Sequence, residues 1–306
     1  MTDLLTGLAV TQPDKTAVID DRGNGDVRIL SYAELEDRSN RLGHVLLEQG
    51  SRRGEKVVWC GQNSVGVVEI INAARKIGAT AVPLNYRLTD AEAAYVVDHC
   101  DARVVYVDAD IAALFGRIRD QLPKVERILV FDGDALDGMV SADPLIDSAD
   151  ASPIEDDESA EAAGTMIYTS GTTGKPKGAL RTATRDPQVA AALFEFIGYV
   201  PDDIHLTTGP LYHSGPGGFL GMALAMGQTM VTQRKFDPED WLRLLETYKC
   251  TSTFSAPTPI RMICTLPDEV KAKYDRSTLR VMIANAAPWS FALKQAFVTD
   301  FPSESL

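Results

Sequence analysis

The feature that most constrains the fold is a repeated alternation of short apolar runs with longer amphipathic segments. The apolar runs have the length of buried strands, and the longer segments have the spacing of helices. This alternation predicts an α/β fold in which helices cover parallel-rich sheets. The expected strands are residues 17–19, 57–60, 81–83, 104–107, 128–131, 166–168, 204–208, 229–233, 251–255 and 279–284. The expected helices are residues 31–50, 65–77, 89–99, 111–121, 186–197, 217–226, 237–248 and 291–301.

An acidic stretch divides this pattern into two parts. Residues 132–161 hold eleven carboxylates, and no Lys or Arg occurs between Ile128 and Gly174. Of the formal net charge of −13, this stretch carries −11, which leaves about −2 for the rest of the chain. We therefore predict a first α/β subdomain over residues 1–131, an acidic linker over 132–163 and a second α/β subdomain over 164–306.

Composition argues against several classes of protein. No stretch approaches about eighteen uninterrupted apolar residues, so no membrane span is expected. Nucleic-acid binding, which would need a basic face, is not expected either. The first seven residues lack a basic region followed by an apolar core, so nothing predicts secretion. The four cysteines (Cys60, Cys100, Cys250 and Cys264) are scattered without metal-ligand spacing, which favours reduced, mostly buried thiols in a cytoplasmic protein.

One stretch gathers the groups that bind polyphosphates. Residues 169–178 contain four hydroxyls, three glycines and two lysines, and they follow the apolar run 166–168. Glycines let backbone N–H groups approach an anion, hydroxyls bond phosphate oxygens or Mg²⁺, and lysines supply positive charge. The sequence therefore predicts a buried strand that leads into a phosphate-binding loop.

The spacing of this loop differs from that of a P-loop, which needs G-x-x-x-x-G-K-[ST] directly before a helix. Here Gly171 and Gly174 are too close together, and Pro176 follows Lys175 where Ser or Thr would stand. We predict a flap that wraps the phosphates, and the spacing disfavours a kinase or a P-loop NTPase. An ordinary polar turn is the alternative, which the strand, the spacing and both lysines disfavour.

Residues 168–178, Tyr-Thr-Ser-Gly-Thr-Thr-Gly-Lys-Pro-Lys-Gly, closely resemble the phosphate-loop signature of the adenylate-forming superfamily. That superfamily includes acyl-CoA synthetases, peptide-synthetase adenylation domains and luciferase-like enzymes. The resemblance implies the N-terminal large domain of that fold. It also implies that ATP and a carboxylate give an acyl-adenylate and pyrophosphate, after which a thiol takes the acyl group. The implied cofactors are ATP, Mg²⁺ and CoA as co-substrate.

The resemblance assigns roles to individual residues of this loop. Thr172 and Thr173 would ligate Mg²⁺, while Lys175 and Lys177 would act as catalytic residues that hold the leaving pyrophosphate. The residues expected to bind the nucleotide phosphates are Thr169, Ser170, Gly171, Thr172, Thr173, Gly174, Lys175 and Lys177.

A second segment follows a predicted strand end, where α/β proteins usually build their sites. In the resembling family, an aromatic-His segment at this place borders the carboxylate and the acyl tunnel. We therefore predict that His213 is catalytic. A histidine merely hydrogen-bonded in a loop, and glycines that only allow close helix packing, are the alternatives. The residues expected to contact the acid are His213, Ser214, Gly217 and Gly218.

A third segment, Asn285, Ala286, Ala287 and Pro288, follows the last predicted strand. The family commonly carries a Gly-Gly-Ala-Pro-like loop around the adenine there, so these residues are expected to contact the base. Asn285 and Ala286 replace glycines, and an ordinary strand-to-helix turn is the alternative. Trp289 is expected to wall the adenine or acyl pocket, with a core tryptophan as the alternative.

The resemblance spans essentially the whole chain, but only about the first half to three-fifths of a family member. The Tyr-Gly-x-Thr-Glu segment, the ribose-binding Asp, most of the β-barrel and the C-terminal domain with its adenylation Lys have no counterpart in these 306 residues. We therefore expect the 306-residue chain alone to bind nucleotide weakly and to be inactive or weakly active.

The leading interpretation is an acid–thiol ligase of the acyl-CoA synthetase type. Between Asp203 and Asp237 no acidic residue is present to pair with a substrate ammonium, which favours a plain carboxylic acid, fatty or related, over an amino acid. One alternative is an acyl-AMP ligase that serves a carrier protein. Another is a non-catalytic fragment that binds nucleotide or acyl groups. The identity of the acid and a homodimeric state are left open.

Overall fold

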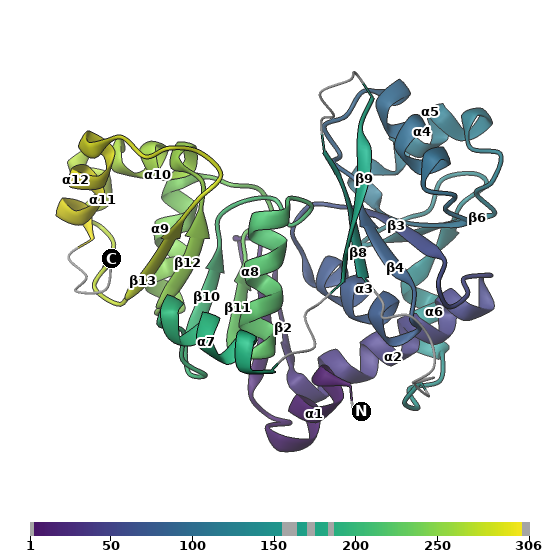
Figure 1. The fold of residues 1–306 in the computed structure, drawn as a ribbon, viewed down its shortest axis with the longest axis horizontal. Helices are drawn as coiled ribbons and strands as arrows, with labels where there is room; N and C mark the ends of the chain where they lie inside the picture. The colour runs from purple at the N-terminus through teal and green to yellow at the C-terminus, as the bar shows by residue number, and fades with distance from the viewer. Residues whose placement is uncertain (1–2, 155–163, 170–174, 183–186, 302–306) are drawn as a thin grey trace. The chain divides into compact units, whose positions relative to one another are not determined.

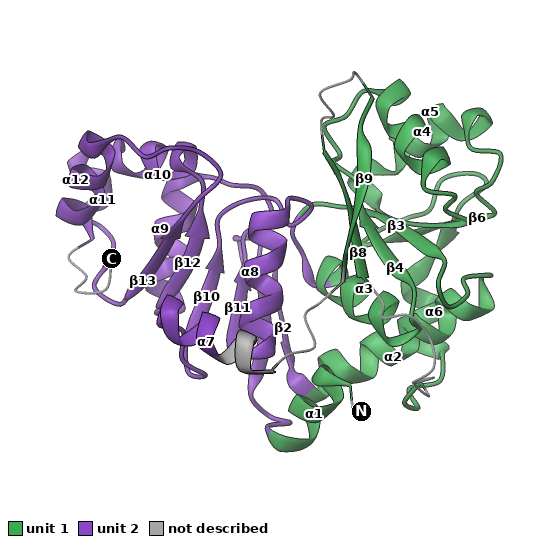
Figure 2. Ribbon diagram, in the orientation of Figure 1, with its two compact units in different colours: residues 1–11, 33–62, 66–183 green, residues 12–32, 63–65, 184–306 purple. Residues whose placement is uncertain are grey.

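The structure, a computed structural model, describes residues 3–154, 164–169, 175–182 and 187–301. These residues form one seven-stranded and one six-stranded sheet, with helices packed against them (Figure 1). Both sheets are parallel-rich, which confirms the predicted α/β fold class. The chain divides into two compact units (Figure 2). Unit 1 contains residues 1–11, 33–62 and 66–183, and unit 2 contains residues 12–32, 63–65 and 184–306.

The sheet of unit 1 has the strand order β7-β6-β5-β3-β4-β8-β9. Its neighbouring strands are parallel except for β8 and β9, which run antiparallel. The strands are β3 (Lys56–Cys60), β4 (Thr80–Pro83), β5 (Val104–Asp108), β6 (Arg127–Phe131), β7 (Val140–Ser141), β8 (Gly164–Thr169) and β9 (Lys177–Thr182). The accompanying helices are α1 (Leu4–Thr11), α2 (Tyr32–Glu48), α3 (Val65–Lys76), α4 (Asp90–His99), α5 (Ala112–Ile118) and α6 (Ala142–Ser148), with short 3-10 turns at Ala109–Ile111 and Arg119–Gln121.

The sheet of unit 2 has the strand order β13-β12-β10-β11-β1-β2, and only the β1–β2 pair is antiparallel. The strands are β1 (Thr16–Asp21), β2 (Val27–Ser31), β10 (Ile204–Thr207), β11 (Thr229–Thr232), β12 (Ser252–Ser255) and β13 (Val281–Ala284). The helices are α7 (Pro187–Ile197), α8 (Ser214–Ala225), α9 (Pro238–Thr247), α10 (Pro257–Cys264), α11 (Asp268–Lys271) and α12 (Phe291–Asp300).

Each unit has its own apolar core. In unit 1 the interior strand β5 is buried along its whole length, as expected for a parallel strand with both faces covered. Phe115 of α5 packs into the same cluster and is fully buried. In unit 2, Trp241 of α9 is fully buried against strand residues such as Leu206 and Val231. Burial of these large side chains is the main stabilising contribution in both units.

Two helices begin where the sequence predicts. Thr89 caps α4 by accepting a hydrogen bond from the Glu92 backbone N–H, while the Glu92 side chain accepts from Thr89, which is a complete capping box. Asp237 caps α9 by accepting from the backbone N–H groups of Glu239 (3.0 Å) and Asp240 (2.9 Å), and Pro238 follows at the first turn.

Two hairpins belong to a different sheet from the one that their position in the sequence suggests. The β1–β2 hairpin from the N-terminal part completes the sheet of unit 2, and the β8–β9 hairpin completes the sheet of unit 1. Residues 132–163, for which no elements were predicted, contain β7 and α6. The division into 1–131, 132–163 and 164–306 stays a prediction about domains, and the two sheets distribute the chain differently.

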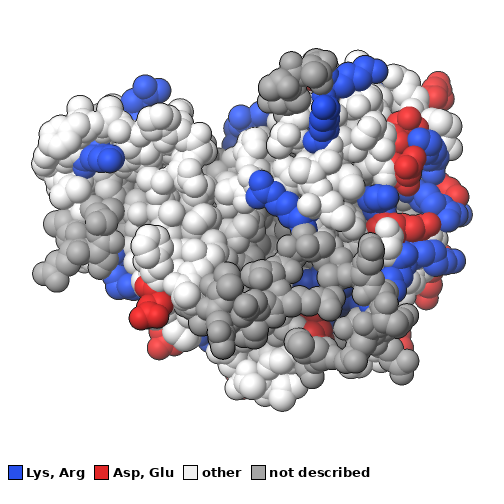
Figure 3. Space-filling view, viewed as in Figure 1, with Lys and Arg blue, Asp and Glu red and all other residues white. Residues whose placement is uncertain are grey.

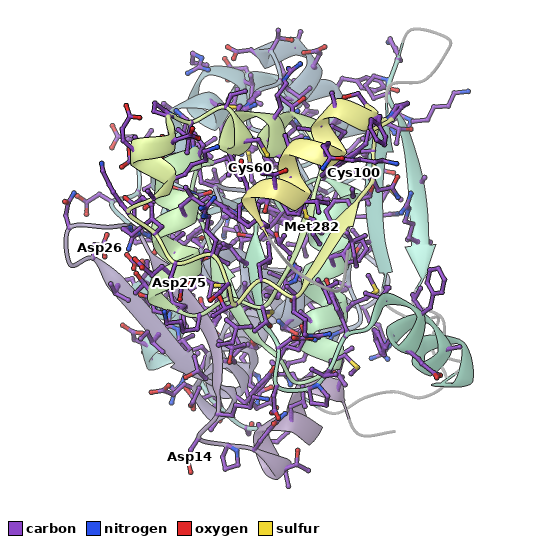
Figure 4. The ribbon with its side chains drawn as sticks, turned by 90° about the vertical axis from the view of Figure 1, so that its left-hand side faces the viewer. Asp14, Asp26, Cys60, Cys100, Asp275 and Met282 are labelled. Carbon is purple, nitrogen blue, oxygen red and sulfur yellow. The ribbon has the colours of Figure 1, made fainter. Side chains whose placement is uncertain are left out.

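The surface charges, the cysteines and the helix lengths can each be compared with what the composition predicts. On the side of unit 1 drawn at the right of Figure 3, basic side chains alternate with acidic ones. All four cysteines are free thiols and three are buried, as predicted; Figure 4 labels two of them, Cys60 and Cys100. Within the described ranges, no helix combines the length and the apolar character that a bilayer crossing requires.

A buried histidine makes the stability of unit 2 depend on pH. His205 of β10 is 1% exposed, and its Nδ1 lies 3.3 Å from the Tyr199 hydroxyl and 3.2 Å from Ser252 Oγ. Burial lowers the pKa of His205 to about 4, from an ordinary value of 6.5. The unfolded chain therefore binds this proton more readily than the folded chain does, and stability rises with pH across this window.

We predict that the free energy of unfolding falls by up to about 3 kcal/mol as the pH decreases from 6.5 to 4. In this range His205 is protonated in the unfolded chain and must lose that proton to be buried in the folded chain. Denaturant unfolding between pH 4 and 8 would measure this loss. His205→Gln should flatten the curve in this window. Equal pH dependence in the wild type and His205→Gln would contradict the prediction.

Candidate functional site

The predicted phosphate-binding segment connects the two strands of an edge hairpin in unit 1. Strands β8 and β9 pair antiparallel from Gly164 opposite Thr182 to Thr169 opposite Lys177. The segment is therefore followed by a strand and not by the helix of a P-loop, as its spacing indicated. Residues 164–168 of β8 are half-buried and Thr169 is exposed, so this strand is not fully buried as predicted, because the neighbouring β9 is an exposed edge strand.

The described part of this segment contains its first threonine and both of its lysines. Thr169 and Lys177 are cross-strand partners at the end of the hairpin, so their side chains share one face of the sheet. Lys175 and Lys177 are both exposed. Ser170, Gly171, Thr172, Thr173 and Gly174 lie outside the described residues, so their predicted roles stay predictions.

Helix α4 supports this hairpin with aromatic side chains that no sequence motif indicates. The Tyr95 hydroxyl donates a hydrogen bond to the carbonyl of Pro176 (3.3 Å), and the Lys175 ammonium lies 5.0 Å from the centroid of the Tyr95 ring. Distances of this size are typical of a cation–π contact. Tyr95 therefore contacts two neighbouring residues of the segment at once.

A second contact fixes the strand that leads into the segment. The Tyr168 hydroxyl and His99 Nδ1 are hydrogen-bonded at 2.7 Å, and their rings meet edge to face with centroids 5.7 Å apart. Partial burial raises the pKa of Tyr168, so its hydroxyl stays protonated. Tyr95 and His99 lie one helical turn apart on α4, with ring centroids 5.2 Å apart. This spacing was the only sequence signal for the pair.

The predicted acid-binding segment follows β10 in unit 2. The chain turns at residues 209–213 and enters α8, whose N-cap is His213. The His213 backbone N–H donates to the carbonyl of Pro210 (3.0 Å), and its ring centroid lies 4.4 Å from that of Tyr212. His213 and Ser214 are exposed, whereas Tyr212 is buried and anchors the turn. The imidazole is thus presented at a strand end, where α/β sites are built.

The glycines of α8 separate into two kinds. A Cβ on Gly217 would lie 2.6 Å from the backbone oxygen of Leu211, so Gly217 permits close packing of the helix against the preceding turn. A Cβ on Gly218 or Gly221 would meet no atom within 4 Å. Close packing therefore accounts for Gly217, while open space adjoins Gly218.

The predicted adenine-binding loop follows β13 and is exposed from Asn285 to Pro288. Ala286 has a φ of +74°, the left-handed region that favours glycine. The Asn285 side chain accepts a hydrogen bond from the Ala286 N–H (2.7 Å), and the Asn285 N–H donates to the carbonyl of Ser255 (3.3 Å). Asn285 thus holds the left-handed turn.

Trp289 packs mainly as a core residue. Its ring meets Phe297 edge to face with centroids 6.1 Å apart and lies against the apolar cluster of unit 2. Its Nε1 is buried without a hydrogen-bond partner in the described structure. These contacts favour the core alternative for Trp289, and its contact with a ligand stays a prediction.

The described residues contain no cluster of three or more His, Cys, Asp or Glu side chains that could hold a metal ion. The two residues predicted to ligate Mg²⁺, Thr172 and Thr173, lie outside these residues. Their hydroxyl oxygens are suitable donors, because Mg²⁺ commonly takes few protein ligands and completes its shell with phosphates and water.

Relatives of known function match most of this chain. A family model described as AMP-binding enzyme matches residues 7–306. Indoleacetate–CoA ligase of Aromatoleum aromaticum is 32% identical over 273 residues, which cover 89% of this chain and 52% of that protein. Fatty acid–[acyl-carrier-protein] ligase ScoC of Streptomyces coeruleorubidus is 29% identical, over 87% of this chain and 50% of that protein. The chain thus spans about half the length of the curated relatives it matches.

A solved structure matches the fold. The inhibitor-bound N-terminal domain of FACL13 from Mycobacterium tuberculosis superimposes with a TM-score of 0.85 at 24% identity, and the match covers 97% of this chain and 72% of that one. At this identity the likeness concerns the fold alone. It confirms the predicted architecture of an N-terminal large domain.

We predict that Ala286→Gly raises the free energy of unfolding by about 1 kcal/mol, because glycine adopts φ +74° without the steric penalty of a Cβ. Thermal or denaturant unfolding would measure the gain. Ala287→Gly is the matched control at a neighbouring exposed position without positive φ, and it should lower stability slightly. A loss of stability in Ala286→Gly would contradict the prediction.

The two kinds of glycine in α8 give a further prediction. Gly217→Ala should lower the free energy of unfolding by about 1–3 kcal/mol, because the new Cβ overlaps backbone that cannot move freely. Gly218→Ala should instead raise it by up to about 1 kcal/mol, because alanine favours the helix and meets open space. Denaturant unfolding of both variants tests the difference, and equal stabilities would refute it.

Proposed function

The chain belongs to the AMP-binding enzyme family, and we propose that it acts in an acid–thiol ligase that uses ATP to activate a carboxylic acid. The loop at residues 168–178 resembles the phosphate-loop signature of such enzymes. The match of the family model over residues 7–306 is the observation that carries this proposal. A carboxylate oxygen attacks the α-phosphorus of ATP, the bond to the bridging oxygen breaks, and pyrophosphate leaves. The sulfur of CoA then attacks the acyl carbon, AMP leaves, and the thiol proton passes to solvent.

The hairpin segment of unit 1 would bind the phosphates. Lys175 and Lys177, exposed on either side of Pro176, would neutralise the charge that develops on the leaving pyrophosphate. The contact of Tyr95 with Lys175 supports this role, because it holds the first of the two lysines in place. Backbone N–H groups beside Gly171 and Gly174 and the hydroxyls of Thr169, Ser170, Thr172 and Thr173 would bond the phosphate oxygens. When bound, Mg²⁺ would neutralise phosphate charge, with the hydroxyls of Thr172 and Thr173 as protein ligands.

Unit 2 would bind the acid and the adenine. His213 would bond the carboxylate from the N-terminus of α8, where the helix dipole also favours a negative charge. Ser214 and the open space beside Gly218 would receive the acyl group. The residues proposed to contact the adenine are Asn285, Ala286, Ala287 and Pro288.

A fatty or related carboxylic acid is the proposed substrate class. The absence of an acidic residue between Asp203 and Asp237 supports a substrate without an ammonium group. One relative acts on an aromatic acid by its name and another on fatty acids, so both kinds of acid belong in any test. We also propose the cytoplasm as the compartment, in keeping with the free thiols.

A carrier protein is the second candidate for the thiol acceptor, and the likeness to an acyl-carrier-protein ligase favours it specifically. Both acceptors present a thiol to the same acyl-adenylate. Formation of acyl-CoA from CoA, compared with acylation of a phosphopantetheine-bearing carrier protein, distinguishes the two candidates.

The test is acid-dependent exchange of labelled pyrophosphate into ATP by the full-length protein, with fatty, aromatic and sterol-type carboxylates; the 306 residues alone are expected to show weak exchange or none. We predict exchange with one class of acid and a loss of about 100-fold in Lys175→Ala, because transition-state charge is no longer neutralised. Lys124→Ala, which removes an exposed lysine elsewhere in unit 1, is the matched control and should retain full exchange.

Absence of exchange with every acid would count against adenylation. A rise in melting temperature on addition of ATP, without exchange, would instead favour the non-catalytic nucleotide-binding alternative. Unchanged exchange in both Lys175→Ala and Lys177→Ala would refute the assigned roles of these lysines.

A further inference from the structure

The side chain of Asn63 makes three hydrogen bonds to backbone groups at the ends of two strands of unit 2. Its Nδ2 donates to the carbonyls of Gly209 (3.0 Å) and Gln233 (3.0 Å), and its Oδ1 accepts from the N–H of Leu211 (2.9 Å). The residue is only 5% exposed. Both donor hydrogens and the amide oxygen are therefore used, which fixes the orientation of the amide.

These bonds join the turn after β10 to the end of β11. Gly209 and Leu211 belong to the turn, whereas Gln233 directly follows β11. Strands β10 and β11 pair in parallel, so their carboxyl ends reach the same edge of the sheet. The Asn63 amide thus bridges two strand ends beyond the point where the backbone ladder between them stops.

Asn63 is itself held in place by a neighbouring strand. The backbone N–H of Val65 donates to Asp20 Oδ2 (3.2 Å), and Asp20 of β1 is 1% exposed. The same oxygen accepts from Arg22 Nη2 (2.9 Å). The short segment 63–65 is therefore anchored to the sheet independently of the turn that Asn63 contacts.

The turn held by Asn63 leads directly to His213. The helix that His213 caps rests against this turn, because a Cβ on Gly217 would lie only 2.6 Å from the oxygen of Leu211. The His213 N–H also donates to Pro210, between the two turn residues that Asn63 bonds. A shift of Leu211 would therefore move the first turn of α8 and the imidazole with it.

We propose that Asn63 is the positioning residue that fixes His213 and the first turn of α8 for the carboxylic acid. This inference rests on the proposed role of His213 in acid binding. Without the amide, two carbonyls and one N–H at a buried place would lose their partner, and the turn would have to move to satisfy them. The bonds of Asn63 involve neither the lysines of unit 1 nor the loop 285–288 proposed to contact the adenine, so the effect should fall on the acid and not on ATP.

The test compares Asn63→Leu and Asn63→Asp with the wild type in the intact protein. Leucine has a similar size but makes no hydrogen bonds, whereas aspartate keeps one acceptor and turns oxygen toward two carbonyls. Asn72→Leu is the matched control, because Asn72 is also a buried asparagine (1% exposed) but, among the described residues, bonds only groups of its own helix α3.

Two readouts are measured: the acid and ATP dependence of pyrophosphate exchange, and hydrogen–deuterium exchange of the peptide that contains Leu211. Both Asn63 variants should lose about 10- to 100-fold in kcat/KM for the acid, while the KM for ATP stays within about twofold. The Leu211 peptide should exchange faster in these variants than in the wild type or in Asn72→Leu.

The outcomes separate this inference from the proposed function. A wild type without exchange for any acid would overturn the proposed function. An active wild type, with Asn63→Leu retaining its kcat/KM for the acid or losing equally for acid and ATP, would overturn the positioning role alone. Thermal unfolding checks that each variant is folded, and Asn63→Asp supplies the comparison where Asn63→Leu does not fold.

Discussion

The parallel pairing of β1 with β11 is the interaction on which the second sheet depends. It joins the N-terminal part of the chain to a strand from its last third, from Val18 opposite Met230 to Asp20 opposite Thr232. The buried hydroxyl of Tyr32 adds a hydrogen bond to the carbonyl of Gln228 (2.6 Å) beside this pairing. Without β1, β11 would present unpaired backbone groups as a sheet edge. In unit 1, β8 pairs with β4 in the same way, so each sheet needs strands that are distant in sequence.

The parallel core was predictable because its signals are local. A covered strand such as β5 is apolar from Val104 to Val107, and helices such as α4 and α9 carry their capping residues beside their first turns. The outer antiparallel strands β2 and β9 carry no such signal. β9 is exposed along the part of its length whose side chains are described, and β2 is buried only at Leu30, so neither shows a clear apolar face. Each pairs with the neighbouring strand of its hairpin, β1 or β8, and the sheet it joins is set by the pairing of that neighbour with a distant strand, which no local pattern encodes.

The residues of the candidate site also differ in whether the sequence predicts them. The lysines of the hairpin segment were predicted from the composition of residues 169–178 and from the resemblance to the superfamily, and His213 from its place after a strand end and from the same resemblance. The residues that hold them in place are common ones in ordinary positions. Tyr95 lies on a helix far from the segment in sequence, and Asn63 is one asparagine in a short connection between β3 and α3. Only the fold shows that these side chains reach the backbone of the site.

The loop after β13 shows how a backbone shape can be kept without glycine. The left-handed conformation of Ala286 costs about 1–2 kcal/mol in an L residue. The loop is exposed, so surrounding atoms do not force this conformation. The two hydrogen bonds of Asn285, one to the next N–H and one to Ser255, offset the cost by holding the turn from within. The substitution of glycines by asparagine and alanine therefore exchanges conformational freedom for local hydrogen bonding, and the chain still turns sharply at the strand end.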